Sequence, residues 1–125
     1  MGIIDYIDNN KHLKTLFPHG VEEVLVGQFG LDQGRFSLNL HVYTKPAQET
    51  PKWGIWGRDY DVIVIQLLGV GLGEINIRNW DNFKSGVLTC EKRDGTLFLS
   101  YDVDECAFKI SCRGLALQKC STYIA

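Results

Sequence analysis

Residues 53–80 read WGIWGRDYDVIVIQLLGVGLGEINIRNW, and this stretch decides the fold class. It contains an apolar run, Val62–Leu68, of the kind that forms a strand buried on both faces. After the glycine-rich link Gly69–Gly73, apolar and polar residues alternate in Ile75–Arg78, as they do in a half-buried strand. The stretch therefore predicts the centre of an antiparallel sheet, in which Asp59–Leu68 pairs with Leu72–Trp80.

Further strands with period-two alternation follow on both sides of this stretch. Phe36, Leu38, Leu40 and Val42 share one face of an expected strand. A turn at residues 32–34 precedes it, and the Asp94-Gly95 pair is a strong hairpin signal later in the chain. The other expected strands cover residues 21–29 (with a possible bulge at Gly27), 86–92, 96–102, 107–113 and 115–124.

The N-terminal segment predicts a helix. Apolar residues recur at three- and four-residue spacing between Ile3 and Phe17, and Asn9-Asn10 either interrupts this helix or divides it into two short pieces. We therefore predict an α+β fold in which residues 1–125 form a single domain. Its sheet is a twisted antiparallel sheet or partial barrel of about seven or eight strands in a meander, with one N-terminal helix. An all-β sandwich is the alternative.

Size and charge exclude several classes of protein. The chain has 125 residues, of which 45% are hydrophobic and 22% charged, and its net charge is −2. A nucleic-acid-binding protein needs clustered Lys and Arg to replace counterions. A net charge of −2 does not suggest such a cluster. The longest apolar run is far shorter than the roughly 20 residues that span a bilayer, and the first residues do not resemble a signal peptide. We expect a cytoplasmic protein with no nucleic-acid or membrane partner.

The four cysteines, Cys90, Cys106, Cys112 and Cys120, do not have the spacing of a metal site. Structural zinc sites bring their ligands in closely spaced pairs such as C-x-x-C, and the sequence contains no such pair. Free thiols in a reducing compartment pack like small apolar residues, and this is what we expect here. Neither a metal nor another cofactor is expected.

The sequence contains no recognisable catalytic constellation. Gly69–Gly73 is spaced like a phosphate-binding loop, but such a loop precedes a helix, whereas a strand is expected after this one. Its glycines are expected to form a turn with positive φ angles. His12, His19 and His41 are scattered, and none forms a pattern with a nucleophile and an acid. We therefore expect that the protein is not an enzyme.

Two acidic groups and three tryptophans are the candidate contact residues. Asp102, Asp104 and Glu105 form the denser acidic group, and Asp59 and Asp61 form the second. Each group is either a solvated turn or an electrostatic contact with a basic partner, since opposite charge speeds association and selects the partner.

The tryptophans have different expected roles. Trp80 ends an alternating strand and is expected in the core. Trp53 and Trp56 lie in a loop flanked by Gly and Pro, where they either cap the sheet or belong to a binding patch, because Trp is enriched at interface hot spots.

Taken in order, these features resemble a bacterial family. After the N-terminal helix come Pro51-Lys52-Trp53, the strand Val62–Leu67 with its embedded Gln66, Gly69-Val70, a strand that ends in Trp80, Phe108–Cys112 and Ser121-Thr122-Tyr123. This series resembles the immunity protein 50 family, whose members are immunity proteins of polymorphic-toxin, or contact-dependent growth inhibition, systems. The resemblance covers most of the chain, from the helix to Tyr123.

The resemblance implies a small cytoplasmic protein that binds a cognate toxin domain and neutralises it, which protects the producing cell and its siblings. It implies no catalytic residue. A nuclease toxin would present a basic nucleic-acid-binding surface that suits acidic groups. We therefore predict that the toxin-binding residues are Asp102, Asp104, Glu105, Asp59, Asp61, Trp53 and Trp56. A small-ligand-binding β-barrel, with the tryptophans at its mouth, is the alternative.

Overall fold

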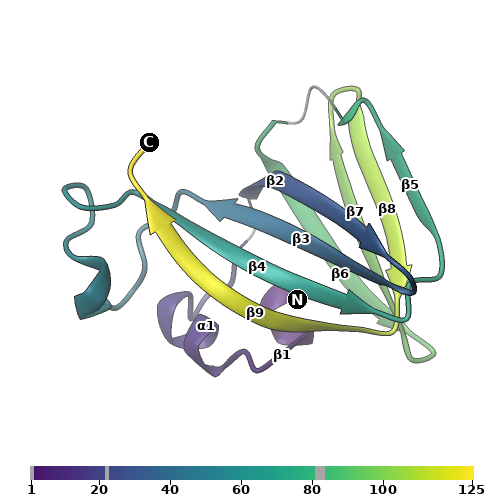
Figure 1. Ribbon diagram of the computed structural model, residues 1–125, viewed down its shortest axis with the longest axis horizontal. Helices are drawn as coiled ribbons and strands as arrows, with labels where there is room; N and C mark the ends of the chain where they lie inside the picture. Colours follow the sequence, from purple (N-terminus) through teal and green to yellow (C-terminus); the bar gives the residue numbers. More distant parts are fainter. Residues whose placement is uncertain (1, 22, 81–83) are drawn as a thin grey trace.

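A computed structural model describes residues 2–21, 23–80 and 84–125 of the chain. Its described elements form a nine-stranded mixed sheet and one short α-helix, α1 (Lys11–Leu16) (Figure 1). The strands are β1 (Ile7–Asp8), β2 (Glu23–Asp32), β3 (Arg35–Val42), β4 (Val62–Val70), β5 (Ile75–Arg78), β6 (Gly86–Arg93), β7 (Thr96–Val103), β8 (Cys106–Cys112) and β9 (Gly114–Tyr123). Two 3-10 turns, η1 (Ile3–Tyr6) and η2 (Pro51–Trp53), complete the described elements. The prediction of a sheet-dominated fold is confirmed.

The strands lie in the order β1-β9-β4-β3-β2-β6-β7-β8-β5. β1 runs parallel to β9, and the other neighbours are antiparallel. The predicted meander is found within β2-β3-β4 and within β6-β7-β8. The predicted central pair is wrong, because β4 lies between β3 and β9, whereas β5 pairs with β8 at the far end of the order.

The link between β4 and β5 explains this error. It is not a hairpin, because its backbone bonds to other segments: the Leu72 N–H donates to the Gly34 carbonyl (3.2 Å), and the Gly73 N–H donates to the Ser111 carbonyl (2.8 Å). These bonds carry the chain from β4 to the outer edge of β8. Where the later segment returns, the Arg113 N–H donates to the Val70 carbonyl (2.9 Å).

The glycines of the link have different roles. Gly71 has a positive φ of 65°, as expected for a turn, whereas Gly69 belongs to strand β4. A Cβ on Gly69 would overlap the ring of Phe36, which is buried on β3. The expectation that these glycines serve a turn is therefore confirmed for Gly71. It is wrong for Gly69, which lies within β4, where the ring of Phe36 leaves no room for a Cβ.

Apart from the two-residue strand β1 at its edge, the sheet consists of two four-stranded parts joined by a narrow junction. β2 pairs with β6 only through Glu23–Val87 and Val24–Gly86. Beyond that point the parts β9-β4-β3-β2 and β6-β7-β8-β5 diverge, and Figure 1 shows them at an angle to each other. Their inward side chains share one core, to which the alternating positions of β3, β4, β7 and β8 contribute. The four positions predicted to share one face of β3, Phe36, Leu38, Leu40 and Val42, are buried. Alternate positions of β7 and β8 are buried as well: Leu97, Leu99, Tyr101, Phe108, Ile110 and Cys112.

The N-terminal segment forms two short helical pieces rather than one helix. Between η1 and α1 the chain pairs briefly with β9 as β1, and then Asn9 adopts a positive φ of 61°. The Asn10 side-chain amide donates to the Ile4 carbonyl at 2.8 Å. The interruption at Asn9-Asn10 is therefore confirmed. Leu13 and Leu16 bury the inner side of α1.

Two further sequence predictions have opposite outcomes. The register of β2 shifts between Val26 and Gln28, so the bulge expected at Gly27 is confirmed. The core position expected for Trp80 is wrong, because 38% of this residue is exposed. Its ring lies edge-on to Phe29, with ring centres 6.0 Å apart, just beyond the end of the short edge strand β5.

Candidate functional site

The loop between β3 and β4 holds both candidate tryptophans against one buried tyrosine. The ring of Tyr60, which is fully buried, lies 5.9 Å from the ring of Trp53 and 5.3 Å from that of Trp56, edge-on in both cases. Trp53 also lies edge-on to His12 of α1, at 5.9 Å. Both tryptophans are half-buried. Trp53 therefore caps the fold between α1 and the loop, and Trp56 keeps part of its ring at the surface.

Asp59 fixes the conformation of the same loop. Its carboxylate accepts the backbone N–H of Ile55 at 2.7 Å and pairs with the guanidinium of Arg58 at 3.0 Å. The hydrogen bond from Ile55, followed by that from Arg58, holds the pKa of Asp59 below its ordinary value. Asp59 is thus already engaged within the chain.

Replacing Gly54 should test this arrangement. Gly54 has φ 88° and ψ −146°, a conformation that is essentially restricted to glycine, and an added Cβ would overlap the Asp59 carboxylate. Gly57 also has a positive φ, of 85°, but an added Cβ there has open space. We expect Gly54→Ala to cost about 1–3 kcal/mol of unfolding free energy, and more than Gly57→Ala. Urea unfolding followed by tryptophan fluorescence measures both, and equal costs would show that Asp59 does not constrain Gly54.

Asp61 lies beside an exposed group of apolar side chains, which we call the tyrosine patch (Tyr43, Tyr123 and Ile124). These residues are 45%, 39% and 53% exposed, respectively. The Asp61 N–H donates to the Tyr123 carbonyl (3.1 Å), and its carboxylate accepts the Ala125 N–H (2.7 Å). A side-chain hydrogen bond joins Tyr43 and Tyr123 and contributes, after burial, to raising the pKa of Tyr123. Asp61 therefore connects the loop to the end of β9.

The tyrosine patch continues onto the outer face of β2-β3-β4-β9. The hydroxyl of Tyr123 lies 2.8 Å from Nδ1 of His41, whose pKa is lowered by burial. Further along this face, side-chain amides pair between strands: Asn39 donates to Gln28 (3.1 Å) and Gln66 donates to Gln118 (3.0 Å). These amides and the tyrosine patch give the face a mainly uncharged surface.

The other predicted acidic group lies elsewhere. Asp102 is exposed on β7, and Asp104, with φ 55°, lies in the turn after it. Asp104 approaches the ammonium of Lys84 at 3.6 Å, and both side chains are exposed. The backbone carbonyl of Glu105 accepts the side-chain amide of Asn79 at 2.7 Å.

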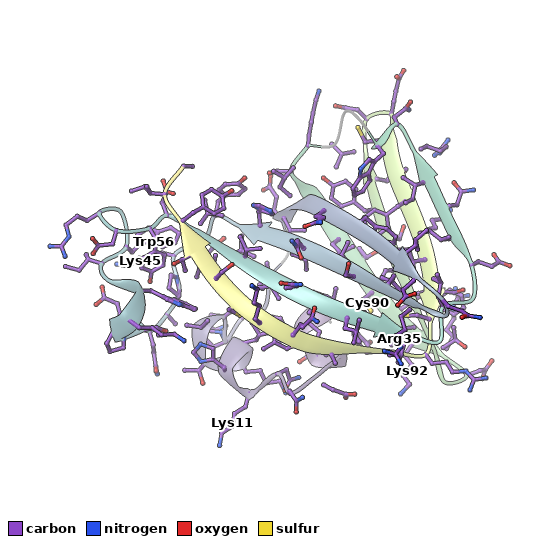
Figure 2. The ribbon with its side chains drawn as sticks, viewed as in Figure 1. Lys11, Arg35, Lys45, Trp56, Cys90 and Lys92 are labelled. Atoms are coloured by element: carbon purple, nitrogen blue, oxygen red, sulfur yellow. The ribbon has the colours of Figure 1, made fainter. Side chains whose placement is uncertain are left out.

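The structure therefore separates the two predicted acidic groups. One loop, between β3 and β4, holds Trp53, Trp56, Asp59 and Asp61. Figure 1 shows this loop at one end of the long axis, near the C-terminus, and Figure 2 labels Trp56 within it. The turn between β7 and β8 lies in the other part of the sheet, at the top of Figure 1. The two groups are therefore two separate candidate contact surfaces.

The outer face of β6-β7-β8-β5 forms a broad, open depression of about 1570 Å³. Its charged lining residues are balanced, with three carboxylates and three basic groups: Glu74, Glu91, Asp102, Arg78, Arg93 and Lys109. The guanidinium of Arg93 lies 4.3 Å from the ring centre of Phe98 and forms an ion pair of 2.9 Å with Glu91. Glu91 and Arg93 thus satisfy one another, and the depression lacks the enclosure that buries a small ligand.

The described residues offer no metal site or membrane helix. Among residues 2–21, 23–80 and 84–125, no group of three or more His, Cys, Asp or Glu side chains is placed to hold a metal ion. The four cysteines are not joined in disulfides, and they are buried except for the half-buried Cys120. No helix in the described part of the chain is long and apolar enough to cross a membrane.

Sequence reasoning missed the tyrosine patch. Tyr43 follows β3 and Tyr123 ends β9, and these two strands are far apart in the sequence. They come together because both pair with β4, one on each side. The outward positions of β9 hold polar side chains at Lys119 and Ser121 and then an aromatic ring at Tyr123. An exposed aromatic ring at the end of a polar strand face was the signal available in the sequence.

Comparison with known proteins found no match among family models, curated proteins or solved structures.

Proposed function

We propose that this chain is an immunity protein that binds a cognate bacterial toxin domain in the cytoplasm and neutralises it, without chemistry of its own. The order of sequence features from the N-terminal helix to Tyr123 supports this proposal by its resemblance to immunity protein 50. The observation that carries it is the tyrosine patch. Exposed Tyr43, Tyr123 and Ile124 lie at the end of the molecule that also holds half-buried Trp56 (Figure 2).

The chemistry of this surface suits a protein partner. Tyrosine and tryptophan are enriched at binding hot spots because they supply a large contact area and a polar group from a rigid side chain. Asp61 adds one carboxylate beside the patch, which favours a basic surface on the toxin, whereas Asp59 is engaged by Ile55 and Arg58 within its own loop. A nuclease, whose own substrate is polyanionic, has such a surface.

A small-ligand-binding barrel receives less support. Such a protein holds its ligand in a cavity that covers most of the ligand surface. Here the inward side chains of β3, β4, β7 and β8 fill the space between the two parts of the sheet and are almost fully buried. The tryptophans pack around Tyr60 instead of lining a barrel mouth.

Co-expression with the toxin domain encoded beside this gene is the direct test of the function. We expect this chain to restore the growth of cells that express the toxin domain, and the two proteins to co-purify. Cells that stop growing despite a soluble, folded immunity protein would contradict the proposed function.

Alanine substitution tests the tyrosine patch as the contact. We expect the double variant Tyr123→Ala, Ile124→Ala to bind the toxin domain about tenfold to a hundredfold more weakly, because hot-spot aromatics cost roughly 1–3 kcal/mol when truncated. Val87→Ala is the matched control, since Val87 is apolar and 54% exposed but lies at the β2–β6 junction. Calorimetric titration measures affinity, and circular dichroism checks the fold. Equal affinities would exclude the patch.

The acidic turn is the second predicted contact, and the same titration tests it. Reversing Asp102 and Asp104 to Lys should weaken binding less than the patch variant does, because exposed ion pairs contribute roughly 1 kcal/mol or less. Any effect should shrink at higher salt. A larger loss than that of the patch variant would move the interface to the turn between β7 and β8.

A further inference from the structure

The outer edge of β9 is open along most of its length. β1 pairs only with Leu115 and Ala116, after which the positive φ of Asn9 turns the chain away into α1. Among the described residues, no strand pairs with the outer side of β9 from Leu117 to Tyr123. This segment of seven residues spans about 23 Å at the usual rise of a strand.

Such an edge presents a row of backbone donors and acceptors that fits an extended peptide. The chain itself shows that the edge is competent to pair, because β1 adds to it in parallel over two residues. The edge at the other end of the sheet is much shorter, since β5 has four residues, Ile75–Arg78. The open part of β9 contains no proline, and the features that discourage strand addition there are one charged residue, Lys119, and the register shift of β9 at Gln118, which leaves Lys119–Tyr123 regular.

Two lysines determine what kind of strand suits this edge. Lys119 lies on the outward face of β9 and is exposed. Lys52 of η2 is exposed as well; burial raises the pKa of the Cys120 thiol to about 11, and the charge of Lys52 opposes this rise to a smaller extent. Neither lysine has an ion-pair partner among the described residues. No acidic side chain lies within the open segment, so acidic residues on an added strand would meet unpaired positive charge.

We propose that the toxin domain binds in part by strand addition, with an extended toxin segment that carries acidic side chains pairing along Leu117–Tyr123 of β9. This inference rests on the proposed function and specifies its contact. The open edge ends at Tyr123, so it is continuous with the tyrosine patch. Aromatic contacts at the patch and backbone pairing along β9 would then form one interface.

Hydrogen exchange of the complex with the toxin domain encoded beside this gene tests the pairing. We expect exchange to slow at alternate amides between residues 117 and 123, because a bonded edge strand directs every second N–H to its new neighbour. Amides of β7, in the other part of the sheet, should not change. A complex that forms without added protection in β9 would overturn strand addition and leave the immunity role intact. No complex at all would reject the proposed function, and this inference with it.

Charge reversal tests the acidic character of the added strand. We expect Lys52→Glu combined with Lys119→Glu to weaken toxin binding about tenfold, with a smaller loss at high salt. Lys92→Glu is the control, because Lys92 is an exposed lysine on β6, at the end of the molecule opposite Trp56 (Figure 2). Circular dichroism verifies that all variants fold. Equal binding by the double variant and the control would overturn the charge assignment.

The protein without toxin provides a last discrimination. If a second copy of this chain occupied the edge, β9 amides would become more protected as the protein concentration rises, and light scattering would show a dimer. We expect a monomer whose β9 exchange does not depend on concentration. A dimer with protected β9 amides would overturn the assignment of the edge to the toxin.

Discussion

The protein should lose about 5 kcal/mol of unfolding free energy between pH 9 and pH 11. Burial raises the pKa of the Cys90 thiol from its ordinary 9.0 to about 12 and that of Cys112 to about 11. Burial likewise raises the pKa of Tyr101 from 10.0 to about 12. These three side chains are 6%, 1% and 1% exposed, respectively.

The direction follows from proton binding. Between the ordinary and the raised pKa values, the unfolded chain releases protons that the folded chain retains. The stabilisation is therefore complete below about pH 9 and is lost as the pH rises toward the folded-state values. Each group contributes about 1.4 kcal/mol per pH unit while it is ionised only in the unfolded chain. A loss of this size is a large share of the roughly 5–15 kcal/mol that holds a typical domain folded.

Urea unfolding at several pH values, under reducing conditions, measures this loss. The control is the double variant Cys90→Val, Cys112→Val, which replaces both thiols with groups of similar size that cannot ionise. Its unfolding free energy should fall less steeply, by about 1.4 kcal/mol per pH unit for each thiol removed. Identical slopes for the two proteins would mean that the thiols do not ionise on unfolding.

Truncating Phe36 should cost about 3–5 kcal/mol of unfolding free energy. The residue is 1% exposed, and its ring stacks on Phe29 with ring centres 5.7 Å apart. It also covers Gly69 of β4, where an added Cβ would overlap the ring. We expect Gly69→Ala alone to cost about 1–3 kcal/mol through overpacking.

The two substitutions should not be additive. Phe36→Ala removes the ring that the new methyl group would strike, so the double variant should cost clearly less than the sum of the single variants. Gly114→Ala is the control, because an added Cβ there meets Val70 at an ordinary 3.5 Å and should change stability by about 0.5 kcal/mol or less. Thermal or urea unfolding of the four proteins completes the cycle. Additive costs would show that Phe36 does not lie over Gly69.

Local patterns predicted most strands but not their order. Alternation along residues 35–42 and 96–102 was sufficient because one face of each strand is buried, and Asp94-Gly95 forms the expected tight turn with positive φ at both residues. The partner of β4 was not predictable in this way. Its choice depends on long-range backbone bonds, such as that from Gly73 to Ser111, that leave no periodic signal.

The candidate site was partly accessible from the sequence for the same reason. The Trp53–Asp61 segment was identified because Gly, Pro and Trp mark an unusual loop within one stretch of chain. This segment lies near Tyr43 and Tyr123 only because β3 and β9, which are far apart in the sequence, both pair with β4. Acidic composition, by itself, did not distinguish a carboxylate that holds a loop, such as Asp59, from one that is free to meet a partner.

The bond between Arg113 and Val70 has a consequence for the architecture of the chain. The β5–β8 unit leaves the first four-stranded part at Val70 and returns at Gly114, which pairs with Val70 in the sheet. Residues 71–113 are therefore topologically an insertion at the tip of a β4–β9 hairpin. Changes of length within this insertion leave the backbone ladder of β4 and β9 unbroken. The surface that carries the tyrosine patch and the open edge can thus diversify independently of the inserted half.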